Sequence, residues 1–150
     1  MRREGARQFV VTNKLKQAVA QRLQPYAVQF GYMFGSAVTG RLHPESDVDI
    51  AVYFDPRLPH REMFRQTLAL HGSLAGTLAV PEEAIDVTVL NNAPILLQHV
   101  VTSEGVVVHE RNHDARVEFE MSVMRRRDDE RHYRRLSRQV FLTRLAGETL

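Results

Sequence analysis

The chain of 150 residues contains no cysteine. Disulfide bonds, thiolate zinc sites and thiol nucleophiles are therefore excluded, and the composition suits a reducing compartment. No apolar run approaches the length of about 18 residues that a membrane span requires. The charged N-terminus, residues 1–7, also lacks the long apolar segment of a signal peptide. We therefore expect a cytoplasmic protein with no membrane attachment.

The net charge is also small, +2, but it is unevenly distributed. Residues 125–138 hold seven arginines and three acidic residues, which leaves the rest of the chain at about −2. Such a basic segment could bind nucleic acid or an acidic protein surface. A solvated helix with ion pairs between successive turns is the simpler interpretation. Because the segment lacks the repeated interleaving of aromatic residues with arginines that base stacking uses, direct nucleic-acid binding is not expected.

The length fits one domain, and 43% hydrophobic with 25% charged residues is typical of a globular protein. Helical spacing and flanking prolines predict four helices: from Thr12 or Asn13 to Pro25, about 60–80, 94–103, and from about 114 onward. Apolar and alternating runs predict four strands: 27–34, 47–54, 84–90 and 106–109. This order predicts an α/β fold with a central sheet and helices packed mainly on one side.

The expected last helix has an unusual distribution of apolar residues. Two stripes are expected to face the core: Val117, Met121 and Met124, and later Leu136, Val140 and Leu145. Residues 125–132 between them offer nothing apolar. We expect the helix to leave the core there or to meet a partner. Tyr133, in the same basic segment, could itself be modified, although tyrosines are more often core or rim residues.

Two aspartates lie on one face of the second expected strand. Because side chains alternate across a strand, Asp47 and Asp49 share one face. The alternate apolar residues, Val48, Ile50 and Val52, face the core. Asp86 has the same outward position in strand 84–90. If the two strands are neighbours, about 4.8 Å apart, the three carboxylates converge and repel one another unless a cation lies among them. With no cysteine and no HExxH pair, oxygen ligands favour Mg²⁺ or Mn²⁺ over zinc.

A glycine-serine pair comes where the first strand ends. Gly35 allows the backbone to approach a ligand closely, and the hydroxyl of Ser36 with nearby N–H groups can hold phosphate oxygens. Taken singly, a Gly-Ser pair is usually a turn and an Asp-x-Asp is usually a solvated strand edge. Phosphates facing a metal held by aspartates is, however, the layout of phosphoryl or nucleotidyl transfer. The order and spacing of these motifs together indicate that chemistry.

The sequence resembles the minimal nucleotidyltransferases of the DNA polymerase β superfamily, whose signature is Gly-Ser, ten residues, and Asp-x-Asp. It matches at Gly35, Ser36, Asp47 and Asp49, and the similarity covers roughly residues 10–125. Further segments that look like the family are Ser46 to Val52, Ala84 to Asn91, Ala93-Pro94 and Glu104 to Val108. The resemblance implies a single nucleotidyltransferase domain over 1–150, with a mixed sheet, a core of about 10–110 and a helical extension of about 113–147.

More narrowly, the chain is similar to the antitoxin member of HEPN–MNT toxin–antitoxin pairs. That resemblance implies transfer of AMP from ATP to a tyrosine hydroxyl of a partner HEPN ribonuclease, which silences the toxin. It implies that three carboxylates bind two Mg²⁺ or Mn²⁺ ions: Asp47, Asp49 and Asp86. It implies that four residues contact the nucleotide: Gly35, Ser36, Arg41 and Ser46. Many relatives carry arginines shortly after the Gly-Ser, where this chain has no cation before Arg41.

Two other functions are compatible with the same motifs. The first is transfer to a small molecule, as in the aminoglycoside nucleotidyltransferases, which usually add a helical domain to hold the drug. Here about 40 residues follow the last expected strand, enough for one long helix, so a separate protein acceptor fits better. The second is a non-catalytic antitoxin that binds nucleotide and masks its toxin by complex formation.

Overall fold

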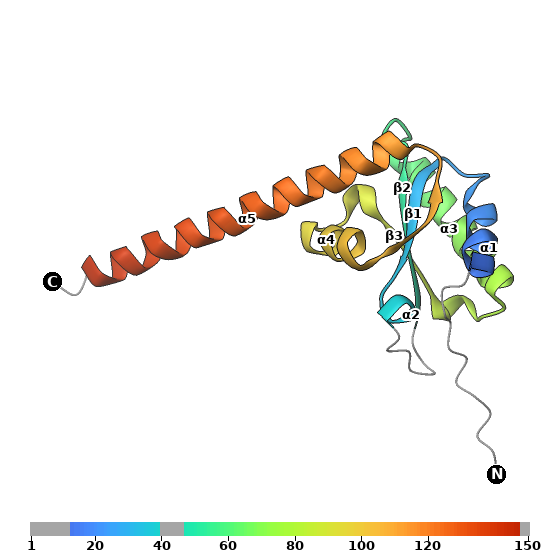
Figure 1. Cartoon of the computed structure of the whole chain (residues 1–150), viewed down its shortest axis with the longest axis horizontal. Coiled ribbons are helices and arrows are strands. Elements are labelled where there is room, and N and C mark those ends of the chain that lie inside the picture. The colour runs from blue at the N-terminus through green and yellow to red at the C-terminus, as the bar shows by residue number, and fades with distance from the viewer. Residues whose placement is uncertain (1–12, 40–46, 148–150) are drawn as a thin grey trace, which may run out of the picture.

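Four strands form one sheet in the order β3-β2-β1-β4 in the computed structural model, which describes residues 13–39 and 47–147 (Figure 1). The strands are β1 (Val28–Phe34), β2 (Val48–Phe54), β3 (Ile85–Val89) and β4 (Val106–Glu110). The helices are α1 (Asn13–Leu23), α2 (Ser36–Thr39), α3 (His60–Leu78), η1 (Glu82–Ala84), η2 (Leu90–Asn92), α4 (Ile95–Glu104) and α5 (His113–Gly147). The predicted α/β class and the predicted order of elements are confirmed.

The sheet is mixed, and its register decides which side chains meet. Strand β1 runs antiparallel to both β2 and β4, whereas β2 and β3 are parallel. The crossover between β2 and β3 is made by α3, which has 19 residues and starts directly after Pro59. The predicted adjacency of the segments 47–54 and 84–90 is therefore confirmed, and it is the adjacency on which the carboxylate site depends.

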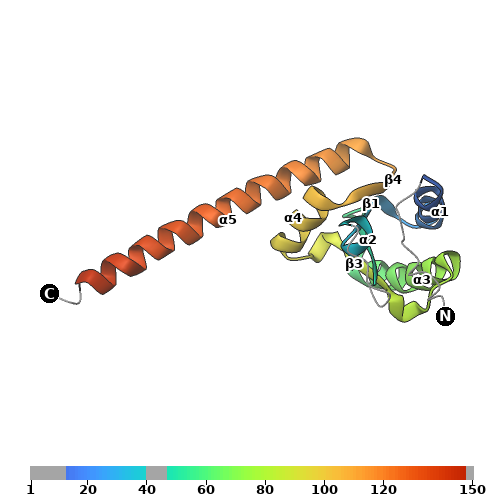
Figure 2. The ribbon, with the colours of Figure 1, turned by 60° about the horizontal axis from the view of Figure 1, so that its bottom comes forward.

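Helices cover both faces of the sheet, so the expectation that they pack mainly on one side is wrong. Helices α1 and α3 lie on one face, and α4 and the first half of α5 lie on the other (Figures 1 and 2). The reason is the composition of β1, in which six of the seven residues are buried. Met33 joins the first core cluster, whereas Phe30 and Tyr32 join the second. A strand that is apolar on both faces needs a cover on both.

Helix α5 leaves the core about a third of the way along its 35 residues (Figure 1). Its buried residues are Phe119 and Val123, whereas Met121 is 53% and Met124 is 62% exposed. The predicted apolar stripe through the two methionines is therefore wrong, because the helix is rotated so that an aromatic ring faces the sheet. Every residue from 131 to 147 is exposed, so the expected departure from the core is confirmed. The second expected stripe, Leu136, Val140 and Leu145, therefore does not face the core, because the helix has already left the domain.

A polar network fixes the first turns of α5 to β1. The buried Tyr32 donates its O–H to Glu120 at 2.5 Å, and Arg116 bridges Glu120 at 2.8 Å and Glu110 at 2.7 Å. Burial and the adjacent carboxylate raise the pKa of the Tyr32 phenol above its usual value, so this hydroxyl stays protonated. The network fixes the direction in which α5 leaves the domain. Within residues 13–39 and 47–147, no helix is both long and apolar enough to cross a lipid bilayer.

Candidate active site

Two carboxylates meet at one end of the sheet because of the parallel pairing of β2 and β3. Asp49 and Asp86 are direct register partners on these neighbouring strands. Asp47 stands directly before β2 and is exposed, as is Asp86, whereas Asp49 is partly buried. Asp47 and Asp49 are separated by one residue whose side chain is buried in the core, Val48. The three predicted carboxylates therefore gather at the end of the sheet where β2 and β3 begin.

Asp49 is the carboxylate most strongly affected by this arrangement. Its pKa is raised from 3.8 to about 6, first by burial and then by the negative charges of Asp86 and Asp47. Both causes disfavour the ionised form: burial removes water from the carboxylate, and the neighbouring aspartates repel its negative charge. A bound cation would remove the repulsion. The site is therefore electrostatically strained in the form that would bind a metal ion.

Gly35 lies directly against this carboxylate. Strand β1 ends at Phe34, which is the antiparallel partner of Asp49, and Gly35 follows with φ +73°. A Cβ built on Gly35 would lie 2.2 Å from Oδ2 of Asp49, so no other residue fits without moving the carboxylate. A positive φ is also a conformation that glycine adopts without strain. The glycine of the Gly-Ser pair is therefore required twice, for its backbone angle and for the close approach.

Ser36 begins the short helix α2 immediately after this glycine, so it lies beside Asp49 in the fold. The structure thus brings five of the seven predicted site residues to one end of the sheet. They are Gly35, Ser36, Asp47, Asp49 and Asp86. The other two, Arg41 and Ser46, lie outside the described residues.

The chemistry of the donor set fits a hard divalent ion. Carboxylate oxygens are the ligands that Mg²⁺ and Mn²⁺ prefer, and the mutual repulsion at Asp49 indicates that a positive charge is needed there. Among the residues described, no three histidine or acidic side chains are grouped closely enough to hold a metal ion in their present positions. Triphosphate oxygens commonly supply the remaining ligands of Mg²⁺ at such sites.

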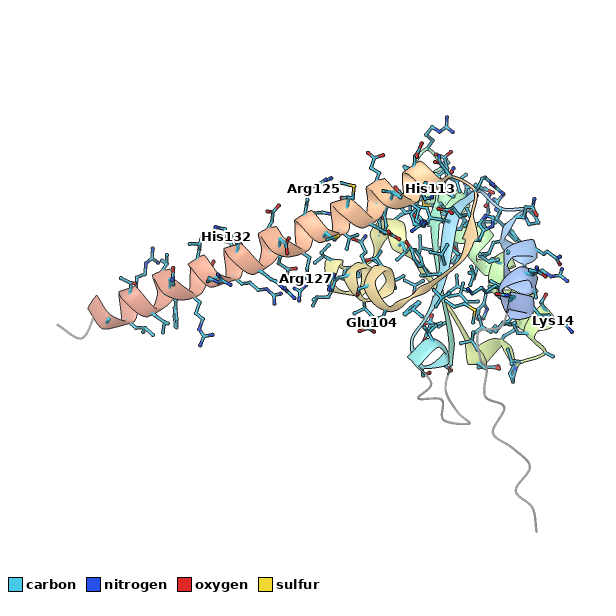
Figure 3. All side chains as sticks on the ribbon, viewed as in Figure 1. Lys14, Glu104, His113, Arg125, Arg127 and His132 are labelled. Carbon is cyan, nitrogen blue, oxygen red and sulfur yellow. The ribbon has the colours of Figure 1, made fainter. Side chains whose placement is uncertain are left out.

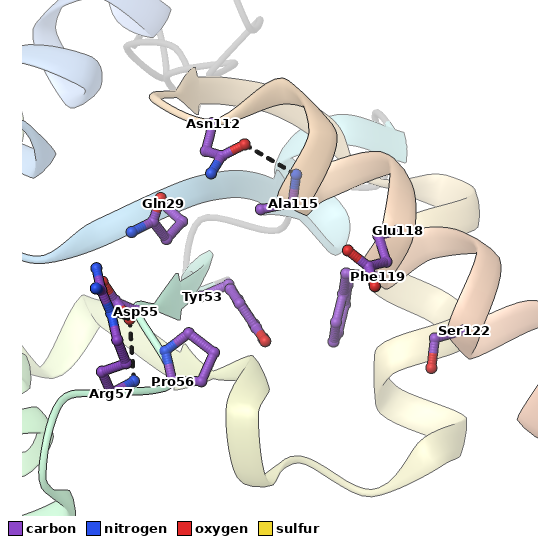
Figure 4. Close-up of a pocket in the computed structure, with 10 residues that line it drawn as sticks. All are labelled: Gln29, Tyr53, Asp55, Pro56, Arg57, Asn112, Ala115, Glu118, Phe119 and Ser122. Atoms are coloured by element: carbon purple, nitrogen blue, oxygen red, sulfur yellow. Dashed lines mark hydrogen bonds and ion pairs between the residues drawn. The ribbon is translucent and has the colours of Figure 1, made fainter.

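A hollow that the sequence did not indicate lies near the opposite end of β2 (Figure 4). It has a volume of about 440 Å³ and is lined by residues from the end of β2, the following turn and the first turns of α5, among them Tyr53, Asp55 and Glu118. Its wall is aromatic, because Tyr53 stacks on Phe30 with ring centroids 4.7 Å apart. Asp55 is already paired with Arg57 at 2.7 Å, which lowers the pKa of its carboxyl to about 2.

Asn91, also absent from the predicted site, locks the same end of β2. Its side chain accepts a hydrogen bond from the N–H of Phe54 and donates one to the carbonyl of Phe54, both at 2.9 Å. The sequence signal was available, since an asparagine directly after a strand often bonds to backbone groups. Its role here is to hold β2 against η2, and it lies far from the carboxylates along the strand.

Comparison with known proteins gives a consistent result. Residues 13–114 match the model of the family described as polymerase beta, nucleotidyltransferase. The chain is similar to the protein adenylyltransferase MntA of Aphanizomenon flos-aquae (strain 2012/KM1/D3), with 30% identity over 95 residues. That match covers 61% of this chain and 63% of the relative, so the chain spans less than two thirds of the curated protein it matches.

Solved structures of toxin–antitoxin complexes contain chains of similar fold. One is a toxin–antitoxin with AMP-PNP, with 21% identity, a TM-score of 0.66, and coverage of 85% of this chain and 98% of the other. Another is a complex of tri-AMPylated Shewanella oneidensis HEPN toxin with MNT antitoxin, with 19% identity, a TM-score of 0.62, and coverage of 87% and 99%. At these identities the likeness shows the fold alone. Because the family model spans more than half of the sequence, the chain belongs to the polymerase β nucleotidyltransferase family.

Proposed function

We propose that this chain is a magnesium-dependent protein adenylyltransferase and an antitoxin. It transfers AMP from ATP to a tyrosine hydroxyl of a partner HEPN ribonuclease and thereby neutralises it. The observation that carries the proposal is the meeting of Gly35, Asp49 and Asp86 at one end of the sheet. The similarity to MntA supports protein as the acceptor class, and the related complexes contain HEPN toxin and a nucleotide analogue.

Each residue of the proposed site has a separate task. Asp47 and Asp49 would hold two magnesium ions, and Asp86 would hold the one nearer the acceptor hydroxyl. When bound, the ions neutralise charge on the triphosphate and lower the pKa of the attacking hydroxyl. Ser36 would donate its hydroxyl to a phosphate oxygen.

The remaining nucleotide contacts are assigned to Gly35 and to two residues outside the described part of the chain. Gly35 leaves the phosphates room to approach Asp49, because it has no side chain in that position. Arg41 and Ser46 are proposed as further nucleotide contacts. We treat residues 1–150 as one domain, with a catalytic core of about 10–110 and an extension of about 113–147.

The partner is proposed to dock in part on α5. Among the described residues after β4, one helix follows, and every residue of it from 131 to 147 is exposed. A small-molecule acceptor would need walls on several sides, which one projecting helix does not give. A protein acceptor can instead use α5 as a contact surface, and arginine forks are suited to carboxylates on such a partner.

The test first identifies a HEPN protein in the reading frames adjacent to the gene of this chain. It then measures the transfer of label to that protein from ATP carrying a radioactive α-phosphate. The wild type should label the HEPN protein and abolish its ribonuclease activity. The double variant Asp47→Asn, Asp49→Asn keeps the side-chain shapes and removes the charges that hold the metal, so transfer should fall by about three or more orders of magnitude. A circular dichroism spectrum equal to that of the wild type would show that the variant is folded.

The control replaces an acidic residue outside the site in the same way. Asp114→Asn removes one charge from an exposed position in the first turn of α5, outside the proposed docking part, and should leave the transfer of AMP close to the wild-type rate. Undiminished transfer by the double variant would reject the site. Neutralisation of the ribonuclease without any labelling would support a non-catalytic antitoxin instead, and labelling of an aminoglycoside but not of the HEPN protein would support a small-molecule acceptor.

A further inference from the structure

Tyr133 differs from the other three tyrosines of the chain in being freely accessible. Its side chain is 71% exposed, on the half of α5 that contacts no core. Tyr32 is 1% exposed and donates its hydroxyl to Glu120. Tyr53 is partly buried in an aromatic stack, and Tyr26 packs against the core. In the structure, Tyr133 is therefore the one tyrosine that projects from the domain on a protruding element.

The position of Tyr133 rules out reaction in its own active site. It lies ten residues beyond Val123, the last buried residue of α5, which is about 15 Å along the helix at a rise of about 1.5 Å per residue. Two views show this part of α5 running away from the sheet and from α2 (Figures 1 and 2). If this protein transfers AMP to that hydroxyl, the transfer must therefore take place in the active site of a second copy of the chain.

The surroundings of Tyr133 complement such a site in charge. Arg131, Arg134 and Arg135 flank it and are exposed (Figure 3 shows how side chains project from this helix into solvent). The active site has the opposite character, because Asp47, Asp49 and Asp86 gather there and the ATP triphosphate adds further negative charge. Residues 35–39, Gly-Ser-Ala-Val-Thr, supply no cation of their own. Arginine forks from an incoming α5 would pair with the phosphate oxygens.

Apolar residues beside Tyr133 provide a second contact surface for such an encounter, in addition to the charged residues. Leu136 and Val140 follow at the third and seventh positions after Tyr133, on the same face of the helix. They are 46% and 52% exposed, and with Phe141 they line one shallow hollow on α5.

We propose that Tyr133 is a second acceptor of AMP, modified in the active site of another copy of the same chain. The inference rests on the proposed adenylyltransferase function and adds a substrate to it. The Tyr133 oxygen attacks the α-phosphorus of ATP and forms a phosphodiester bond. The bond between that phosphorus and the oxygen bridging to the β-phosphate breaks, pyrophosphate departs with the electron pair, and the phenolic proton passes to water. The product places a negative phosphodiester in the middle of the arginine segment 125–138.

The test uses two full-length copies that differ in size, together with ATP labelled at its α-phosphate. The donor is the wild type. The acceptor carries an added tag and the changes Asp47→Asn and Asp49→Asn, so it cannot label itself. We expect label on the tagged acceptor and, by peptide mass spectrometry, one adenylyl group on Tyr133. Adding Tyr133→Phe to the acceptor should abolish the label. Adding Tyr26→Phe, a matched change at a partly buried tyrosine, should leave it unchanged.

A parallel reaction separates this inference from the function on which it rests. The same donor is given the HEPN protein in place of the tagged acceptor. If the HEPN protein is labelled and the tagged acceptor is not, or is labelled at a residue other than Tyr133, the inference is wrong and the proposed function stands. If neither protein is labelled, the proposed function fails and the inference fails with it.

Discussion

Replacing Asp49 with asparagine should stabilise the metal-free protein at neutral pH, although it removes a charge that the proposed reaction needs. The pKa of Asp49 is raised from 3.8 to about 6 by burial and by the charges of Asp86 and Asp47. A carboxyl whose pKa is higher in the folded chain than in the unfolded chain opposes folding once it is ionised. Asparagine has nearly the same shape and no charge, so it escapes this effect.

The magnitude follows from the shift. One pKa unit corresponds to about 1.36 kcal/mol, so a shift of about two units sets an upper limit of about 3 kcal/mol. Solvent reaches part of Asp49 and screens its neighbours, which lowers the expected gain to about 1–2 kcal/mol. Well below the unfolded pKa of 3.8 the carboxyl is protonated in both states, and its contribution to stability is fully present. That contribution is lost as the pH rises through the folded pKa of about 6, so the gain from asparagine should appear over this range.

The assay is urea unfolding of both proteins in EDTA, from about pH 4 to about pH 8. Far-UV circular dichroism is the suitable signal because the chain has no tryptophan. Asp49→Asn should be clearly more stable than the wild type at pH 8, and the difference should shrink to a small fraction of that gain at pH 4. The control Asp128→Asn, at an exposed position on α5, should show no such pH-dependent gain. Magnesium with ATP should reverse the order at pH 8.

A wild type that is as stable as Asp49→Asn at pH 8, or more stable, would contradict the reasoning. It would mean that the three carboxylates do not repel one another in the metal-free protein. The electrostatic ground for placing a metal ion among them would then be lost.

Two further predictions concern the glycine of the site and the arginines of α5. Gly35→Ala should lower the free energy of unfolding by about 2 kcal/mol and abolish transfer, because φ is +73° and the new Cβ would lie 2.2 Å from Asp49. Gly76→Ala, in α3 with nothing within 4 Å of the new Cβ, should instead raise it by about 0.5–1 kcal/mol in the same denaturation assay. Arg126→Glu with Arg134→Glu should weaken binding of the HEPN protein at low salt, measured by calorimetry, and leave ATP affinity unchanged. If the affinity for the HEPN protein is unchanged after both charge reversals, this part of α5 is a solvated helix and not a docking surface.

Much of the fold could be predicted because its signals are local. The alternation of apolar and polar residues around Asp49 and Asp86 fixes both strands and both faces. The adjacency of those strands then follows from one helix between them, which is the usual connection of parallel strands. The carboxylate end of the site could be predicted for the same reason, because it depends on two strands and one turn.

The parts that could not be predicted depend on packing between distant segments. Nothing in the spacing of α5 distinguishes a stripe through Met121 from one through Phe119, because both fit a helical period. The sheet selects Phe119, whose ring packs on Phe30 and Tyr53. The second layer of helices follows from the same contact. Its one visible sign in the sequence was the largely apolar composition of β1, which Gln29 alone interrupts with a strongly polar side chain. The raised pKa of Asp49 likewise needs the fold, because Asp86 is distant in sequence.

The two ends of helix α5 differ in how they contribute to the domain. Its first turns, up to Val123, are part of the core, whereas residues 131–147 are all exposed. Substitutions in the second part therefore change the free energy of unfolding little, provided that they keep the helix. The identity of a partner can change there through many small steps, each tolerated by the catalytic core. Under the proposed function, two such toxin–antitoxin pairs can thus lose the ability to bind each other's partner while the carboxylate end of the sheet stays the same.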